Sequence, residues 1–184
     1  MPGGILAVDM GRLSAFACAE PGRRPVWGHT THGDADASGG RLLARARQWL
    51  LALCDYHQPV WIAQEAPYFQ RPGQRTSVPF NHQTQARLQR FAGVAESVAF
   101  ELGVSYREPS ISQVAAHFLG SEGARMRSAK KKQQTVVICK LHGWAPVTQD
   151  EADALALLSW MEWSLSPGQA RLRGEGPLFV TPQG

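Results

Sequence analysis

Four acidic residues carry the strongest chemical signal in this sequence. Asp9 and Glu65 each end a short apolar run, which is typical of a strand buried on both faces. Asp150 and Asp153 lie three residues apart near the start of a helical pattern, so they share one face of that helix. Two strands separated by a helix indicate a parallel sheet, and such sheets bind ligands at the edge where their strands end. We therefore expect the four carboxylates to meet at that edge.

A group of carboxylates of this kind needs a cation. Each close pair repels by about 4 kcal/mol at an intermediate dielectric constant, and a divalent ion removes that penalty. Ligand sets made only of oxygen favour Mg²⁺, or Mn²⁺ as a substitute, over zinc. Two such ions about 4 Å apart would activate a water molecule and stabilise the leaving oxygen of a phosphodiester.

Each acid also has a simpler explanation. A single acid at a strand end is more often a turn former, and Asp150 alone suits the helix dipole, a contribution of about 0.3–1 kcal/mol. Glu151 completes a capping box with Thr148, which gives it a structural role. The simpler explanation fails for Asp153, because the residues three and four positions further along the helix are apolar.

A basic segment lies between residues 125 and 132. Three of its charges fall near the first turn of a helix that we expect Ser128 to cap, although cations oppose the dipole at that end. Backbone amides and lysines together would form a phosphate site there, whereas the default explanation for any one lysine is a solvated surface. The charged residues are Arg125, Arg127, Lys130, Lys131 and Lys132.

The segment 67–80 is rich in Pro, Gly and Gln and combines aromatic with basic side chains. Tyr68, Phe69, Arg71 and Arg75 are suited to stacking on bases or wedging a distorted DNA step. An equally good explanation for the two aromatic residues is that they anchor a surface loop.

The remaining pattern predicts an α/β fold. Three antiparallel strands should open a mixed five-stranded sheet, followed by parallel strands, with helices on its faces. We expect one domain over residues 1–163 and a tail rich in Pro and Gly over 164–184. The expected helices cover residues 41–57, 81–102, 110–119, 128–142 and 148–163, and the third and fifth strands cover residues 25–30 and 104–106.

Composition narrows the class of protein. The net charge of +4 is compatible with a polyanionic partner and does not require one. The three cysteines are widely spaced, which disfavours a disulfide framework or a zinc site and favours a reducing cytoplasm, either bacterial or that of the host of a virus. The sequence shows no signal peptide and no apolar run long enough for a bilayer, so we expect no membrane association.

Three stretches, residues 5–11, 61–65 and 150–156, together resemble the RuvC family of Holliday-junction resolvases, which are ribonuclease H-like nucleases. The most specific is Asp150-Glu151-Ala152-Asp153-Ala154-Leu155-Ala156. The resemblance implies a ribonuclease H-like fold and a magnesium-binding catalytic tetrad of Asp9, Glu65, Asp150 and Asp153. It also implies a catalytic or phosphate-stabilising lysine at Lys131, an aromatic residue (Tyr68 or Phe69) at the junction centre, and a homodimer formed through helix 81–102.

Two positions depart from the family pattern. Met10 replaces a proline that is common after the first acid, and the segment 112–116 lacks a lysine that the family often has there. Both suit a diverged member with broader branched-DNA substrates. The sequence thus predicts a metal-dependent resolvase of four-way DNA junctions, acting in recombination and repair. It gives no prediction about a partner helicase.

Three alternatives compete with this prediction. One is a ribonuclease H-like nuclease acting on other branched DNA or on RNA–DNA hybrids, and another is a junction-binding module without nuclease activity, which the intact set of four acids disfavours. A sugar-kinase or actin-like ATPase can have a similar first strand. That fold needs two such lobes and further glycine-rich phosphate loops, which this sequence lacks.

Overall fold

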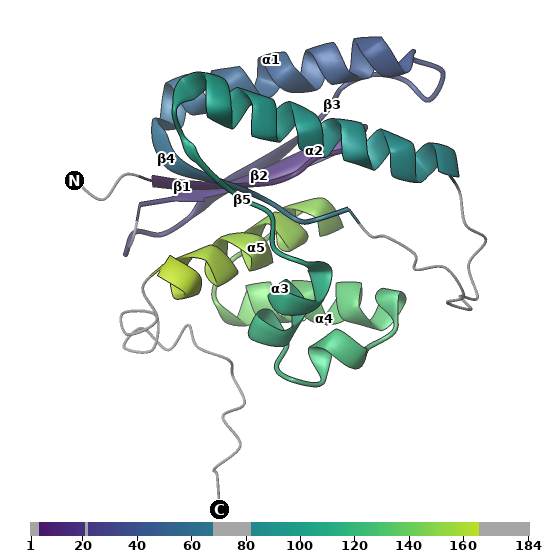
Figure 1. Cartoon of the computed structure of the whole chain (residues 1–184). Helices are drawn as coiled ribbons and strands as arrows, with labels where there is room; N and C mark the ends of the chain where they lie inside the picture. Colours follow the sequence, from purple (N-terminus) through teal and green to yellow (C-terminus); the bar gives the residue numbers. More distant parts are fainter. Residues whose placement is uncertain (1–3, 21, 68–81, 166–184) are drawn as a thin grey trace, which may run out of the picture.

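The computed structural model describes residues 4–20, 22–67 and 82–165, and these form a mixed five-stranded sheet with helices on both faces (Figure 1). The sheet has the order β3-β2-β1-β4-β5, with antiparallel pairing among the first three strands and parallel pairing of β1 with β4 and of β4 with β5. The predicted α/β fold class is confirmed. The strands are β1 (Gly4–Asp9), β2 (Leu13–Ala19), β3 (Val26–Thr31), β4 (Pro59–Gln64) and β5 (Ser105–Arg107).

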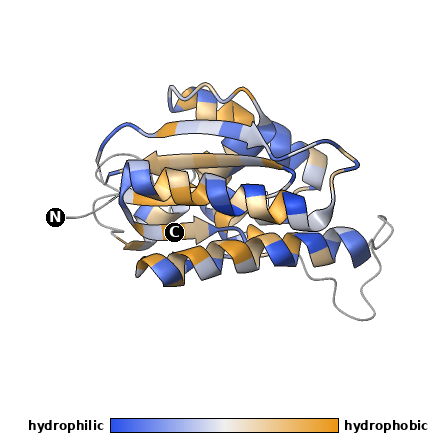
Figure 2. Ribbon diagram, turned by 90° about the horizontal axis from the view of Figure 1, so that it is seen from above, coloured by the Kyte–Doolittle hydropathy of each residue, from blue (hydrophilic) through white to orange (hydrophobic). Residues whose placement is uncertain are grey.

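The helices form two layers. Figure 1 shows α1 and α2 over one face of the sheet and α3, α4 and α5 on the other. Orange and blue residues alternate along the helices in Figure 2, as expected of amphipathic helices that bury one side. The bounds are α1 (Gly39–His57), α2 (His82–Leu102), α3 (Ile111–Phe118), the 3₁₀ turn η1 (Gly123–Arg125), α4 (Ser128–Leu141) and α5 (Gln149–Leu165).

Strand β1 is apolar along its length because both of its faces are covered. Ile5 and Ala7 pack into the core under α5, whereas Leu6 and Val8 pack into the core under α1 and α2. Side chains alternate between the two faces of a strand. Asp9 therefore lies on the α5 face, at the end of the central strand.

Serine caps start two of the helices. The Ser38 hydroxyl accepts a hydrogen bond from the Arg41 amide before α1, and Ser110 forms a full capping box with Gln113 before α3. The predicted cap at Ser128 is wrong. Ser128 is already helical, and Arg127 is the residue whose carbonyl accepts the first intrahelical bond, from Lys131, with an extended backbone and no side-chain cap.

Element boundaries otherwise differ from the predictions by one to two residues. Strand β3 extends through Thr31 because that residue still pairs with Leu13 on β2. Helix α5 continues through Leu165, and residues 166–184, most of the predicted tail, lie outside the described residues. Within the described part of the chain, no helix is long and apolar enough to cross a membrane.

Gly123, at the turn that joins α3 to α4, allows a close backbone approach. A Cβ atom there would lie 2.6 Å from the Ala115 carbonyl oxygen and would clash with Leu119. We expect Gly123→Ala to lower the free energy of unfolding by about 1–3 kcal/mol. The matched change Gly40→Ala in α1, where a Cβ meets nothing within 4 Å, should be neutral or stabilising by up to about 1 kcal/mol. Urea unfolding measures both; equal effects would contradict this packing.

Candidate metal centre

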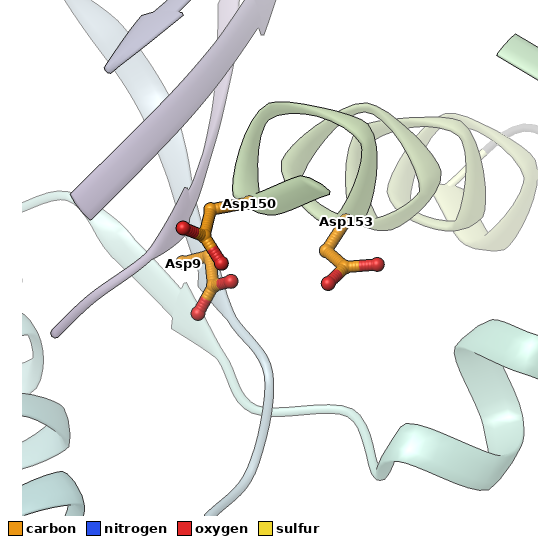
Figure 3. A group of neighbouring side chains, drawn as sticks. All are labelled: Asp9, Asp150 and Asp153. Atoms are coloured by element: carbon orange, nitrogen blue, oxygen red, sulfur yellow. The ribbon is translucent and has the colours of Figure 1, made fainter. Parts of the chain in front are cut away.

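The structure places the four predicted acids around one end of the sheet. Asp9 ends β1, and Glu65 directly follows β4, which pairs in parallel with β1. Asp150 and Asp153 come from the first two turns of α5, which packs on the same face. Figure 3 shows Asp9, Asp150 and Asp153 pointing into a common space under the start of α5. One carboxylate oxygen from each of these three lies within 4.8 Å of the others.

Asp9 is the most perturbed of these acids. Its pKa is raised from 3.8 to about 8, chiefly by burial and then by the negative charges of Asp153, Asp150 and Glu65, while Lys132 opposes the shift. A carboxyl group with such a pKa holds its proton near neutral pH unless a cation takes the proton's place. All of these acids can therefore be ionised together near neutral pH only when a cation is bound.

Glu65 and Asp153 belong to the same electrostatic group. Burial and the Asp153 charge raise the pKa of Glu65 to about 7, against the lowering effects of Lys131 and Lys132. The pKa of Asp153 is raised to about 6, chiefly by burial; Lys132 and Lys131 oppose this shift, and the Asp150 charge adds to it. Glu65 is thus coupled to the cluster electrostatically, although the three oxygens within 4.8 Å of one another come from the aspartates alone.

This donor set suits a hard divalent cation. All donors are carboxylate oxygens, the ligands that Mg²⁺ and Mn²⁺ prefer. Their raised pKa values have burial and mutual repulsion as causes, which a bound cation would relieve. The residues present therefore fit a magnesium-type ion.

The side chain of Glu151 holds the first turn of α5 in place. Its Oε2 accepts hydrogen bonds from the backbone amides of Val147 (2.5 Å) and Thr148 (3.4 Å), and the Thr148 hydroxyl accepts one from the Glu151 amide (3.1 Å). This is the predicted capping box. Burial raises the pKa of Glu151, but hydrogen bonds from His29 and the two amides outweigh it and lower the pKa overall.

The turn after Asp9 is held by a single buried hydroxyl group. The Ser14 hydroxyl donates to the Gly11 carbonyl (3.1 Å) and accepts from the Gly11 amide (3.0 Å). The Nε2 atom of buried His32 lies 2.9 Å from the same oxygen. The single proton of the hydroxyl is already donated to the Gly11 carbonyl, so the bond to His32 must be donated by Nε2–H of the ring. Burial and Arg45 lower the pKa of His32, which keeps the ring neutral and this network intact.

Two lysines of α4 act on the acids. Lys132 lowers the pKa values of Asp9, Glu65 and Asp153, whereas Lys131 lowers those of Glu65 and Asp153. Both lysines are half-buried, whereas Lys130 is exposed. The resemblance placed the catalytic lysine at Lys131 alone; the structure brings Lys132 to the cluster as well.

Of the other predicted DNA-binding residues, the structure describes only the basic ones of the segment 125–130. Arg125 and Arg127 are exposed on η1 and before α4. Tyr68, Phe69, Arg71 and Arg75 lie outside the described residues.

Comparison with solved structures identifies the fold. The structure of Thermus thermophilus RuvC matches with a TM-score of 0.62 at 15% identity, covering 95% of this chain and 98% of that one. T. thermophilus RuvC in complex with a Holliday junction substrate matches with a TM-score of 0.63 at 17% identity and the same coverage.

The yeast mitochondrial Holliday junction resolvase Ydc2 matches with a TM-score of 0.60 at 14% identity, covering 94% of this chain and 81% of that one. The chain has the RuvC fold. By sequence, no known family model and no curated protein matches it. The resemblance stated above is thus confirmed at the level of the fold.

Sequence reasoning missed three contributors to this centre in the RuvC fold. For Lys132 the sequence predicts only a phosphate contact to DNA, and for His29 and His32 it predicts no role. A signal for His29 exists in the hairpin register, since Asp9 pairs with Ala15 and Ala15 with His29. That register places His29 in the same row across the sheet as Asp9, and hence on the same face.

Removing the most perturbed charge should stabilise the metal-free protein. Because the folded-state pKa of Asp9 is raised, its contribution to stability is present below about pH 4 and is lost as pH rises to about 8. We therefore expect Asp9→Asn to raise the melting temperature in EDTA by several degrees at pH 8.5 and by little at pH 4. Calorimetry checks this, and Mg²⁺ should stabilise only the wild type.

Asp55→Asn is the matched control for the same substitution on an exposed helical site. It should leave both the EDTA melting temperature and the Mg²⁺ response unchanged. A lower melting temperature for Asp9→Asn at pH 8.5 would contradict the repulsion described for this cluster.

Proposed function

We propose that this chain is a Mg²⁺-dependent, structure-selective endodeoxyribonuclease that resolves four-way DNA junctions by hydrolysing phosphodiester bonds. One observation carries the proposal: three carboxylates meet within 4.8 Å in a fold shared with Holliday junction resolvases. A neighbour of the same fold is described in complex with a Holliday junction substrate. Its identity to this chain is 17%, so activity and substrate are proposed here.

Each group in the centre has a role in this reaction. Asp9, Glu65, Asp150 and Asp153 would hold the metal, with two ions expected for in-line attack. When bound, Mg²⁺ supplies charge stabilisation of the phosphate and activation of water. Lys131 and Lys132 balance negative charge as it develops on the phosphate oxygens. Lys130, Arg125 and Arg127 contact the DNA backbone further out, where contacts position the substrate without reading its sequence.

Symmetric cutting of a four-way junction requires two centres, and we propose a homodimer formed through α2. Several apolar side chains of α2 remain exposed in the single chain, with Phe100 at 89%, Leu102 at 44% and Leu88 at 36%. Leu88 and Leu102 lie on one side of the helix, since their separation of fourteen residues makes about four turns, and two-fold pairing of that side would bury both and present two centres related by symmetry. Sedimentation of the full chain tests the dimer, and a monomer at micromolar concentration would contradict it.

A ribonuclease H-like nuclease of broader specificity is the second candidate. The observation that favours it is the segment 112–116 on α3, which has no lysine where the RuvC family often has one. A missing charge there would weaken one phosphate contact and relax substrate choice. A module that binds junctions without cutting them is a third candidate; it is disfavoured because a binding surface gains nothing from repelling buried acids.

A side-by-side digestion distinguishes these candidates. Purified full-length protein is incubated with a four-way junction, a flap, an RNA–DNA hybrid and a linear duplex, in EDTA and in Mg²⁺. We expect binding of the junction in EDTA and paired nicks on opposing strands only in Mg²⁺. Equal cutting of all branched substrates favours the second candidate, and binding without any cutting favours the third.

Asp153→Asn should separate binding from cleavage. Cleavage in Mg²⁺ should fall about a thousandfold or more, equal to about 4 kcal/mol of transition-state stabilisation. Junction affinity in EDTA should be unchanged or higher, because the change removes negative charge. Asp55→Asn should match the wild type in both gel-shift and cleavage assays. Normal cutting by Asp153→Asn would rule out the site assignment.

Alanine substitutions test the two lysines of α4. Because Lys132 influences three of the acids and Lys131 two, we expect Lys132→Ala to slow cleavage at least as much as Lys131→Ala, each by about 10- to 1,000-fold. Both should weaken junction binding by less than they slow cleavage. Lys140→Ala, at the far end of α4, serves as the control. Single-turnover kinetics give the rates; a loss confined to binding would make both lysines backbone contacts.

A further inference from the structure

His29 lies on a strand that carries none of the four acids. Strand β3 is the edge of the sheet, and its register with β2 places His29 opposite Ala15, which is in turn opposite Asp9. His29 therefore sits in the same row across the sheet as Asp9 and on the same face. The first turn of α5 lies over this row.

The imidazole of His29 contacts Glu151 directly. Its Nδ1 atom lies 2.7 Å from Oε1 of Glu151, and since an ionised carboxylate can only accept, Nδ1 carries the proton. The other oxygen, Oε2, is used by the amides of Val147 and Thr148. The Glu151 side chain is 4% exposed and that of His29 is 36% exposed. Both oxygens of this buried carboxylate are thus committed, one to the helix end and one to the sheet.

These two sets of bonds have different consequences. The bonds to Val147 and Thr148 are local and fix the shape of the helix end, but they do not fix where that end sits over the sheet. The bond to His29 is long-range and joins the helix to β3. Glu151 lies between Asp150 and Asp153 in sequence, so any shift or rotation of this turn moves both aspartates relative to Asp9.

We propose that His29 is a positioning residue, which acts through Glu151 to hold Asp150 and Asp153 at the distance from Asp9 that a divalent cation requires. This role rests on the metal site of the proposed function. It extends to the α5 side of the cluster what Ser14 and His32 do for the turn after Asp9. Groups behind the ligands commonly change metal affinity by 10- to 100-fold.

Three variants of the full chain test this role. His29→Leu removes the donor and keeps bulk on an exposed edge strand, where it should not prevent folding. His29→Asn keeps an N–H group at the place of Nδ1, since both nitrogens are bonded to Cγ. Thr31→Val is the matched control, two residues along the same strand and on the same face.

The main measurement is the Mg²⁺ dissociation constant of each variant without DNA, by titration calorimetry. We expect His29→Leu to weaken Mg²⁺ binding by about tenfold, and His29→Asn and Thr31→Val to stay within about threefold of the wild type. A wild-type Mg²⁺ affinity for His29→Leu overturns the proposal. So does a weakened affinity that His29→Asn does not restore, because the donated hydrogen bond is then not what matters.

A second measurement separates positioning from simple stabilisation. The melting temperature in EDTA of His29→Leu should fall by a few degrees only, because the buried Glu151 oxygen loses its donor but water can enter at the partly exposed His29 position. A large loss of stability with unchanged Mg²⁺ affinity would make the contact structural only. If the wild type binds Mg²⁺ but cuts no nucleic acid, the proposed function fails and the role of His29 stands. If it binds no divalent ion, both fail.

Discussion

Repulsion among carboxylates in a partly buried position is the constraint on which this structure depends. Asp9, Glu65 and Asp153 all have raised pKa values, for which burial is the largest cause and the other acids a further one. Such an arrangement opposes folding, and a chain retains it only when the surrounding packing compensates. The rest of the fold is therefore organised to hold like charges together.

Packing of the helices on both faces of the sheet stabilises the fold against this repulsion. The central strand β1 is completely buried on its α1/α2 face and on its α5 face, so its last residue, Asp9, has little freedom to move away. Helix α5 is apolar on almost every side from Ala154 to Trp160, which fixes its axis against the sheet. Polar contacts then adjust the ends: the Ser14 hydroxyl holds the turn after β1, and Glu151 holds the start of α5.

Much of this arrangement is predictable from sequence because local rules and the global fold agree. The apolar runs before Asp9 and Glu65 and the apolar helix after Asp153 contain enough information for the mixed sheet and for the meeting of the acids. Caps at Ser38 and Ser110 follow from residue type, whereas Ser128 shows the limit of that rule: the helix begins one residue earlier than the serine pattern suggests. His29 and Lys132 could not be assigned from sequence, because their contacts cross from β3 and α4 to α5 and β1 and depend on how the layers are placed.

The acids of the centre come from opposite ends of the described chain, with Asp9 on the first strand and Asp150 and Asp153 on the last helix. During synthesis, the first strand leaves the ribosome long before α5 does. A nascent chain accordingly lacks the complete group of acids until α5 has been translated, and a product truncated before α5 cannot assemble it. The order of these elements along the polypeptide thus makes the meeting of the three aspartates a late event in synthesis.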